Sequence, residues 1–278
     1  MSTLPTTMRA ILLEQFGSPE TSLKMQNVKA FGINHAEMHM RRGEWAESMP
    51  IIGIECVGVI VYAEYTSAPL TNVVPIPHAL VAKIGWARLG EQLLIRGATS
   101  SFGIAAVKLA VHKGAIVSAT SRKVERGEAL RALGVEQVLE EGEALSERLV
   151  LEGRKFDKVL ELVGNTTLLG SLKMVRRGGK LCLAGFLGGL APLEFNPLLQ
   201  MASGVHFSFF GSFVFGDEEF PLTDVPLEEL VELVVSGKLQ AEPRRVFEFG
   251  ESGVREAHRI MEAGQAEGKM VVVVDAAL

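Results

Sequence analysis

Cysteine is scarce in this chain of 278 residues, since Cys56 and Cys182 are its only two and both lie in apolar stretches. That usage is typical of buried thiols in a reducing compartment rather than of a disulfide framework. Long hydrophobic runs are also missing, because every apolar run stops well short of the roughly 20 residues that a membrane helix needs. The first residues lack the basic region and apolar core of a secretory signal. We therefore expect a cytoplasmic protein with no membrane partner.

Blocks of one charge sign are absent as well, and the net charge is −5. Without a basic stripe, nucleic acid is not expected as a partner. The six histidines form no set with the close spacing of zinc ligands, although His35 and His39 could share a helix face. With no third ligand in view, we expect no metal. The sequence shows no group of nucleophile, base and acid of the kind that a hydrolase uses.

The most informative segment runs from residue 92 to residue 126. An apolar run at 92–96 leads into a turn of small residues at 97–103, a helical pattern at 104–111, and a second apolar run from 114 to 120. This is the order of a dinucleotide-binding βαβ unit, in which backbone N–H groups and the helix start face a pyrophosphate. The candidate cofactor-binding residues in the turn are Thr99, Ser100, Ser101, Phe102 and Gly103.

The end of the second strand indicates which nucleotide is bound. An NAD site usually has Asp or Glu there, to bond the ribose 2′-hydroxyl. This chain has Ser121, Arg122 and Lys123, with Arg126 one helical turn later. Hydroxyl and cationic groups suit a 2′-phosphate, so we expect NADP(H) rather than NAD(H). The competing interpretation is a solvated helix start that happens to be basic.

Strand and helix patterns alternate after this unit and predict an α/β fold with a doubly wound parallel sheet. The expected strands are 137–139, 158–163, 180–184 and 205–210, and the expected helices are 144–151, 166–175 and 225–236. Ligands bind at the carboxyl ends of such strands. Val163, Gly164 and Gly185 are therefore further candidate cofactor-binding residues, on the same edge as the glycine turn.

The first ninety residues have a different pattern. Alternation at 8–13, 52–61 and 73–76 predicts short antiparallel strands. In the tail, a strand at 245–249, a helix at 254–262 and a strand at 269–274 could rejoin either part of the chain.

Several motifs along nearly the whole chain resemble one known family. They are Gly32-Ile33-Asn34-His35-Ala36-Glu37, Ile52-Gly53-Ile54-Glu55-Cys56-Val57-Gly58, Tyr62-Ala63-Glu64-Tyr65, the 96–103 turn, Leu162-Val163-Gly164-Asn165, Arg176-Arg177-Gly178-Gly179-Lys180 and Gly268-Lys269-Met270-Val271-Val272. In this order they resemble the medium-chain dehydrogenase/reductases of the zinc-free quinone oxidoreductase and enoyl reductase type. The resemblance implies a GroES-like β domain over 1–89, a Rossmann domain over 90–240, and a return segment over 241–278 that packs on the first domain.

The resemblance also implies roles for particular residues. Asn34 is the candidate catalytic residue, as a polar contact in the active cleft. Zinc-dependent relatives have Cys at the place of Asn34 and His where this chain has Ile54, which again argues against zinc. An aromatic segment places Phe213, Val214 and Phe215 beside the nicotinamide, and Lys269 lies in a segment that returns toward the cofactor.

Two stretches of the family pattern are missing, one after Ile60 and one after Val81. The expected activity is NADPH-dependent reduction of a small enoyl or quinone-type substrate within secondary metabolism. The sequence leaves open whether the protein forms a homodimer. The alternative is a degenerate reductase that keeps the fold but acts as a cyclase, an isomerase or a binding partner. An incorrectly spliced or truncated gene product would also explain the shortening. An enzyme is favoured, and the substrate is not indicated.

Overall fold

The computed structural model describes residues 9–27, 88–123, 125–211, 226–240 and 243–273. Contacts divide the chain into two compact units, one of residues 77–241 and one of residues 1–76 together with 242–278. Within the described ranges, no helix is long and apolar enough to cross a bilayer. The predicted strands at 52–61 and 73–76 lie outside these ranges.

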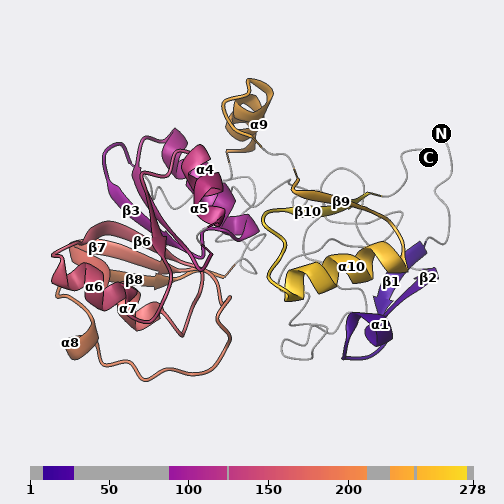
Figure 1. Ribbon diagram of the computed structural model, residues 1–278, viewed down its shortest axis with the longest axis horizontal. Coiled ribbons are helices and arrows are strands. Elements are labelled where there is room, and N and C mark those ends of the chain that lie inside the picture. The colour runs from indigo at the N-terminus through magenta and orange to yellow at the C-terminus, as the bar shows by residue number, and fades with distance from the viewer. Residues whose placement is uncertain (1–8, 28–87, 124, 212–225, 241–242, 274–278) are drawn as a thin grey trace. The chain divides into compact units, whose positions relative to one another are not determined.

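The unit of residues 77–241 is built on one parallel sheet (Figure 1), and its six strands follow the order β5-β4-β3-β6-β7-β8. The strands are β3 (Gln92–Arg96), β4 (Ile116–Ser121), β5 (Gln137–Glu140), β6 (Phe156–Glu161), β7 (Val175–Leu183) and β8 (His206–Phe209). The helices are α4 (Ser101–His112), α5 (Arg126–Ala132), α6 (Leu145–Leu151), α7 (Leu168–Met174), α8 (Pro197–Gln200) and α9 (Leu227–Val235). The predicted parallel α/β fold is therefore confirmed.

Strand order reverses at β3, which is the first strand of this sheet in the chain. β3 pairs in parallel with β4 through Leu93 and Val117, and with β6 through Leu93 and Lys158. The chain thus builds the sheet outward from β3 in one direction and then, from β6 onward, in the other. This is the strand order of a dinucleotide-binding Rossmann sheet, with its topological switch point between β3 and β6.

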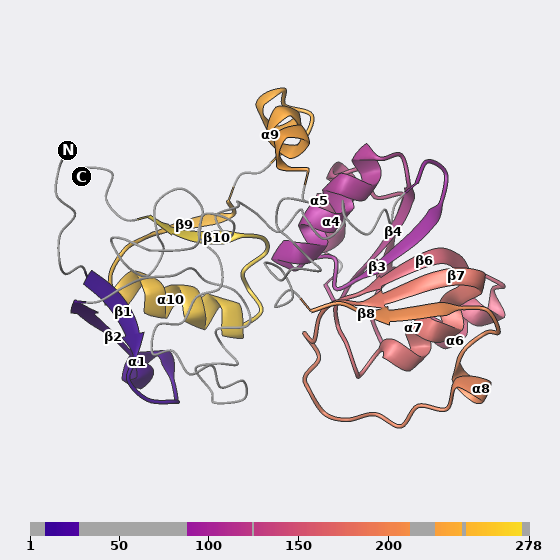
Figure 2. The same cartoon turned by 180° about the vertical axis from the view of Figure 1, so that it is seen from behind.

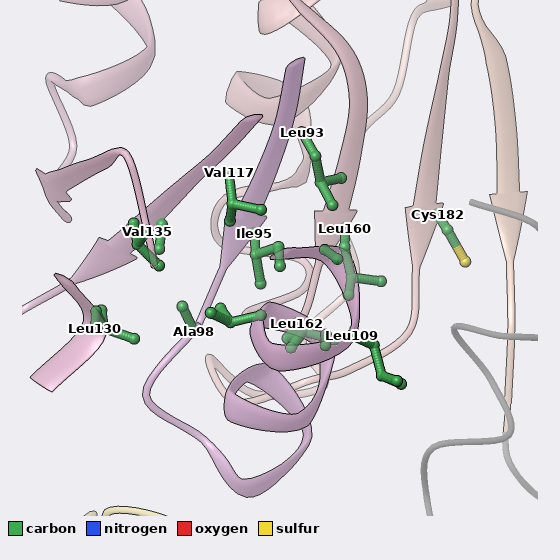
Figure 3. Close-up of a cluster of buried hydrophobic side chains, with 14 of the residues drawn as sticks. Leu93, Ile95, Ala98, Leu109, Val117, Leu130, Val135, Leu160, Leu162 and Cys182 are labelled. Carbon is green, nitrogen blue, oxygen red and sulfur yellow. The ribbon is translucent and has the colours of Figure 1, made fainter. Parts of the chain in front are cut away.

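Both faces of the sheet are buried. Successive residues of a strand point to opposite sides, and in the central strands both sets of side chains are buried. Leu93 and Ile95 of β3 face the cluster that contains Leu109 of α4 and Leu130 of α5 (Figure 3). Leu94, which lies between them in the strand, belongs to the cluster on the other face. That second cluster includes Leu145 and Leu149 of α6 and Leu168 and Leu172 of α7. Helices therefore cover both faces of the sheet (Figure 2).

The unit that contains both ends of the chain is smaller in its described part. β1 (Arg9–Leu13) and β2 (Leu23–Asn27) form an antiparallel hairpin around α1 (Pro19–Ser22). β9 (Arg245–Glu248), α10 (Glu251–Glu262) and β10 (Met270–Val273) form a parallel β-α-β unit.

The hairpin and the helix α10 share one core of Ile11, Leu23, Val254 and Val272. Backbone N–H of Met25 donates to Glu251 Oε1 at 2.8 Å, and Arg255 donates to the carbonyl of Leu23 at 2.7 Å. On the surface Arg259 bonds Glu20 at 2.6 Å and lowers the pKa of that carboxyl to about 2. The tail, for which the sequence pattern allowed either part as a partner, thus packs on the N-terminal hairpin.

Several element boundaries differ from those predicted, and at two of them the structure gives the reason. β7 begins at Val175, five residues before the predicted strand, because Val175 pairs with Phe156 before the register shifts and resumes at Lys180. α10 begins at Glu251 although Gly253 weakens the helical pattern there. A Cβ at Gly253 would lie 2.1 Å from the carbonyl oxygen of Glu248, so the helix can start beside β9 only with glycine at that position.

Two leucines of α6 provide a matched test of the core. Leu149 is 1 % exposed within the second cluster, and Leu151, two residues on, is 88 % exposed. We expect Leu149→Ala to lower the free energy of unfolding by about 2–5 kcal/mol, because it leaves a cavity. Leu151→Ala should change it by less than about 0.5 kcal/mol. Urea denaturation of both variants checks this, and equal effects would contradict the packing described.

Candidate nucleotide-binding site

The turn between β3 and α4 brings backbone into close contact without side chains. Gly97 has φ +75°, a conformation that glycine adopts readily. A Cβ at Gly103 would lie 2.5 Å from the carbonyl oxygen of Gly97 and 2.6 Å from Cα of Ala98. Glycine at position 103 therefore allows the first turn of α4 to pack directly against the loop that precedes it.

Ser100 is the N-cap of α4 and fixes this turn from within. Its hydroxyl donates to the carbonyl of Gly97 at 2.8 Å and accepts the backbone N–H of Gly103 at 3.0 Å. Thr99, Ser101 and Phe102 are half-buried at the same corner, and Phe102 also packs against the core beside α4. A helix start of this kind carries a partial positive charge that suits an anion.

The carboxyl end of β4 carries the predicted cations. Arg122 and Lys123 are exposed, while Ser121 is 5 % exposed. The hydroxyl of Ser121 donates to the carbonyl of Lys123 at 2.8 Å and accepts its N–H at 3.2 Å. Ser121 therefore shapes the turn that presents the two cations. Arg126 is the first residue of α5 and is half-buried.

The loops after β6 and β7 lie against each other, and glycine makes this possible. A Cβ at Gly164, where φ is +96°, would lie 2.9 Å from the carbonyl oxygen of Gly185. A Cβ at Gly185 would lie 2.7 Å from the carbonyl oxygen of Leu162. Backbone N–H of Gly188 donates to the carbonyl of Val163 at 2.7 Å, which ties the two loops together.

The same loops reach the glycine turn. A Cβ on Gly97 would lie 3.0 Å from Cδ1 of Leu187 and 3.2 Å from Cβ of Leu162. The carboxyl ends of β3, β6 and β7 therefore meet at the switch point, as the sequence predicted for its candidates on these three strands.

A buried charged cluster lies beneath these loops, and sequence reasoning did not identify it. Arg96 ends β3 and is 2 % exposed, and Glu161 ends β6 and is fully buried. Arg96 forms an ion pair with Glu141, donating from Nε to Oε2 at 3.0 Å, and its Nη1 donates to Ser171 Oγ at 3.1 Å. The available signal was one charged residue at the end of each of two otherwise apolar strands, which is uncommon unless the charges are paired.

Other predicted site residues are not brought into this site by the described structure. Asn34, Phe213, Val214 and Phe215 lie outside the described residues. Lys269 belongs to the smaller unit, where it is half-buried just before β10 and its carbonyl accepts the N–H of Arg244. The roles expected of these five residues stay predictions.

Among the residues that the structure describes, no three His, Cys, Asp or Glu side chains are grouped as metal ligands. Cys182 is 1 % exposed, and burial raises the pKa of its thiol, which disfavours the thiolate that binds zinc. The described residues do not fit a zinc centre, and zinc independence stays a prediction for the chain as a whole.

Comparison with known proteins places this fold among relatives. The family model described as zinc-binding dehydrogenase matches residues 133–272, half of the chain. Highly reducing polyketide synthase 40 of Fusarium pseudograminearum (strain CS3096) is 31 % identical over 210 residues, which cover 71 % of this chain and 8 % of that protein. This chain therefore spans only a small part of that relative. A mycobacterial protein solved in complex with NADPH has the same fold, with a TM-score of 0.78, 20 % identity, and coverage of 96 % of this chain and 99 % of that one.

A quinone oxidoreductase of Pongo abelii is 26 % identical over 340 residues, which cover 98 % of this chain and 100 % of that protein. The alignment has 340 positions and this chain has only 278 residues. At least 62 of the aligned positions therefore have no residue of this chain. The comparison agrees with the expectation of missing segments. The chain belongs to the zinc-binding dehydrogenase family, as a member of the medium-chain dehydrogenase/reductase superfamily of the quinone oxidoreductase and enoyl reductase type.

Proposed function

We propose that this protein binds NADP(H) and uses it to reduce an enoyl or quinone-type small molecule, within secondary metabolism. One observation supports this most strongly: a Rossmann sheet has its glycine turn at the switch point and two exposed cations, Arg122 and Lys123, at the end of the neighbouring strand. The relatives named above include a quinone oxidoreductase and a polyketide synthase, and a fold neighbour was solved with NADPH.

The residues present fit the dinucleotide. Gly103 allows the first turn of α4 to pack on the backbone of Gly97, which fixes the helix start whose N–H groups would bind a pyrophosphate. Thr99, Ser101 and Phe102 surround the same helix start. Arg122 and Lys123 would bond the 2′-phosphate, with Ser121 holding their turn and Arg126 adding a nearby charge.

The remaining chemistry asks little of the side chains. When bound, the cofactor supplies a hydride to an electron-poor carbon of the substrate. The protein then contributes by positioning the reactants and keeping water out of the cleft. Val163, Gly164 and Gly185 would line the nicotinamide side, together with Phe213, Val214, Phe215 and Lys269. Asn34 is proposed to hold the developing oxygen charge by a hydrogen bond.

A second candidate is favoured by the 62 or more positions of the quinone oxidoreductase that have no residue here. If they belong to the stretches missing after Ile60 and Val81, part of the cover over the nicotinamide is lost and water can enter. The protein would then be a degenerate reductase that binds nucleotide but acts as a cyclase, an isomerase or a binding partner.

We also propose a cytoplasmic location and the family's domain division of 1–89, 90–240 and 241–278, in which residues 77–89 belong to the first domain, whereas contacts group them with the larger unit. If the protein forms a homodimer, we propose that the two copies pair through β8. This strand ends the described sheet and exposes Phe207 by 38 % and Phe209 by 53 %. Exposed sheet edges are suited to pairing with a second copy.

The decisive experiment separates binding from turnover. Purified protein is titrated with NADPH and NADH by fluorescence, and NADPH oxidation is then followed with an α,β-unsaturated thioester and with a quinone. We expect binding to be retained and turnover on simple substrates to be weak, below the usual ~1–1000 per second. Measurable turnover, even below that range, would support the proposed reductase, and absence of turnover the degenerate one. Absence of nucleotide binding would overturn both.

Cofactor choice is tested at the end of β4. We expect Arg122→Ala with Lys123→Ala to weaken NADPH much more than NADH, by about 1–3 kcal/mol for each charged hydrogen bond to the 2′-phosphate that is removed. Arg177→Ala with Lys180→Ala removes the same two charge types from exposed positions of β7 and should leave both affinities unchanged. Equal weakening of NADPH and NADH would refute the assignment of the 2′-phosphate.

The glycine turn is tested at Gly103. We expect Gly103→Ala to push the loop away from α4, to lower the free energy of unfolding by about 1–3 kcal/mol, and to weaken NADPH and NADH alike. Gly142→Ala is the matched control, because a Cβ there meets nothing within 4 Å. Calorimetric titration and thermal unfolding measure the two effects. Unchanged affinity in Gly103→Ala would show that the turn does not form the pyrophosphate site.

A further inference from the structure

Glu161 is a fully buried carboxylate whose two oxygens have different partners. Its Oε1 accepts the backbone N–H of Val163 at 2.7 Å and that of Gly164 at 3.1 Å. Its Oε2 accepts the hydroxyl of Ser171, a buried residue of α7. One side chain thus connects the loop after β6 to the helix that follows it.

A buried carboxylate is costly unless charge and hydrogen bonds compensate it. Arg96 supplies the opposite charge, with Nε 4.0 Å from Glu161 Oε2. Arg96 is itself held by Glu141 and by the carbonyl of Thr167, which accepts from Nη1 at 3.1 Å. Since Arg96 also donates to Ser171 Oγ and to the carbonyl of Thr167, we expect it to keep its place beside Glu161 when Glu141 alone is removed.

The loop that Glu161 holds lies at the switch point of the sheet. A sheet with this strand order binds one nucleotide on each half. Under the proposed function, Arg122 and Lys123 take the adenosine 2′-phosphate on the half formed by β3, β4 and β5. The nicotinamide nucleotide then falls to the half that begins with β6, where Val163 and Gly164 follow the strand.

We propose that Glu161 is a positioning residue that fixes the backbone of Val163 and Gly164 for the nicotinamide half of NADP(H). This inference rests on the proposed nucleotide site. Because its side chain is fully buried beneath the loop, Glu161 acts through the loop and would not touch the cofactor. Its acceptor oxygen, rather than its charge, is what the loop requires.

Two substitutions separate the acceptor from the charge. Glu161→Leu has similar bulk but leaves the N–H groups of Val163 and Gly164 without their acceptor. Glu161→Gln keeps an oxygen acceptor at the place of Oε1, while it removes the charge and puts an NH2 group at the place of Oε2, beside Ser171 and Arg96. Glu141→Leu is the matched control, because it removes another carboxylate partner of the same buried Arg96.

The readout compares NADPH with 2′,5′-ADP, which carries the 2′-phosphate but has no nicotinamide. We expect Glu161→Leu to weaken NADPH by roughly tenfold or more and to change 2′,5′-ADP by less than about twofold. Glu161→Gln should keep NADPH within about threefold of the wild type. Glu141→Leu should lower the melting temperature and leave the ratio of the two dissociation constants unchanged.

Each other outcome has a definite meaning. Parallel loss of both ligands in Glu161→Leu, a changed ratio in Glu141→Leu, or a Gln variant as weak as the Leu variant would overturn the positioning role. If Glu161→Leu does not fold, Glu161→Asp replaces it. Its carboxylate is one methylene shorter, so NADPH should again weaken more than 2′,5′-ADP, and an unchanged ratio would refute the role. A wild-type protein that binds neither ligand would refute the nucleotide site itself.

Discussion

The parallel pairing of β3 with β4 on one side and β6 on the other is the constraint on which this structure depends. Because the three strands point the same way, their carboxyl ends open on one edge. The crossover from β3 to β4 runs through α4, and the chain returns to β6 only after β5 and α6. The loops that leave β3 and β6 therefore diverge to opposite faces, and sheets of this kind bind their ligands between such loops.

Glycines and charged residues have different roles at this edge of the sheet. Gly97, Gly103, Gly164 and Gly185 allow backbone to meet backbone at distances that a Cβ would prevent. The buried ion pair of Arg96 and Glu141 stiffens the layer below them, where a lone charge would be unstable. The exposed cations after β4 lie on a turn that Ser121 shapes. The glycines and the buried ion pair thus determine the shape of the loops without having to touch a ligand. The exposed cations are the residues that can contact a charged ligand.

Much of the larger unit could be predicted from the sequence, because alternation of strand and helix patterns forces crossovers and hence parallel strands. The start of β7 could not be predicted, since residues 176–179 belong to a register shift that only the pairing with β6 reveals. The start of α10 at Glu251, three residues before the predicted helix, could not be predicted either, because Gly253 is there to pack against Glu248.

The site divides along a similar line. Local chemistry predicted the turn at 97–103 and the cations at 122–123 as site residues, because their residue types are unusual at those places. The bonds of Glu161 join residues whose proximity arises from the sheet, so pattern alone could suggest a buried charge but not its partners. Asn34 and the 213–215 segment fall outside the described residues and keep the status of predictions.

The packing of α10 on the first hairpin has a consequence for synthesis of the chain. The bonds from Glu251 to Met25 and from Arg259 to Glu20 close loops of 226 and 239 residues. The unit of residues 77–241 is continuous in sequence and can fold as it leaves the ribosome, whereas the hairpin has to wait for α10. During translation the hairpin therefore waits for nearly the whole chain before Val254 and Val272 can cover Ile11 and Leu23.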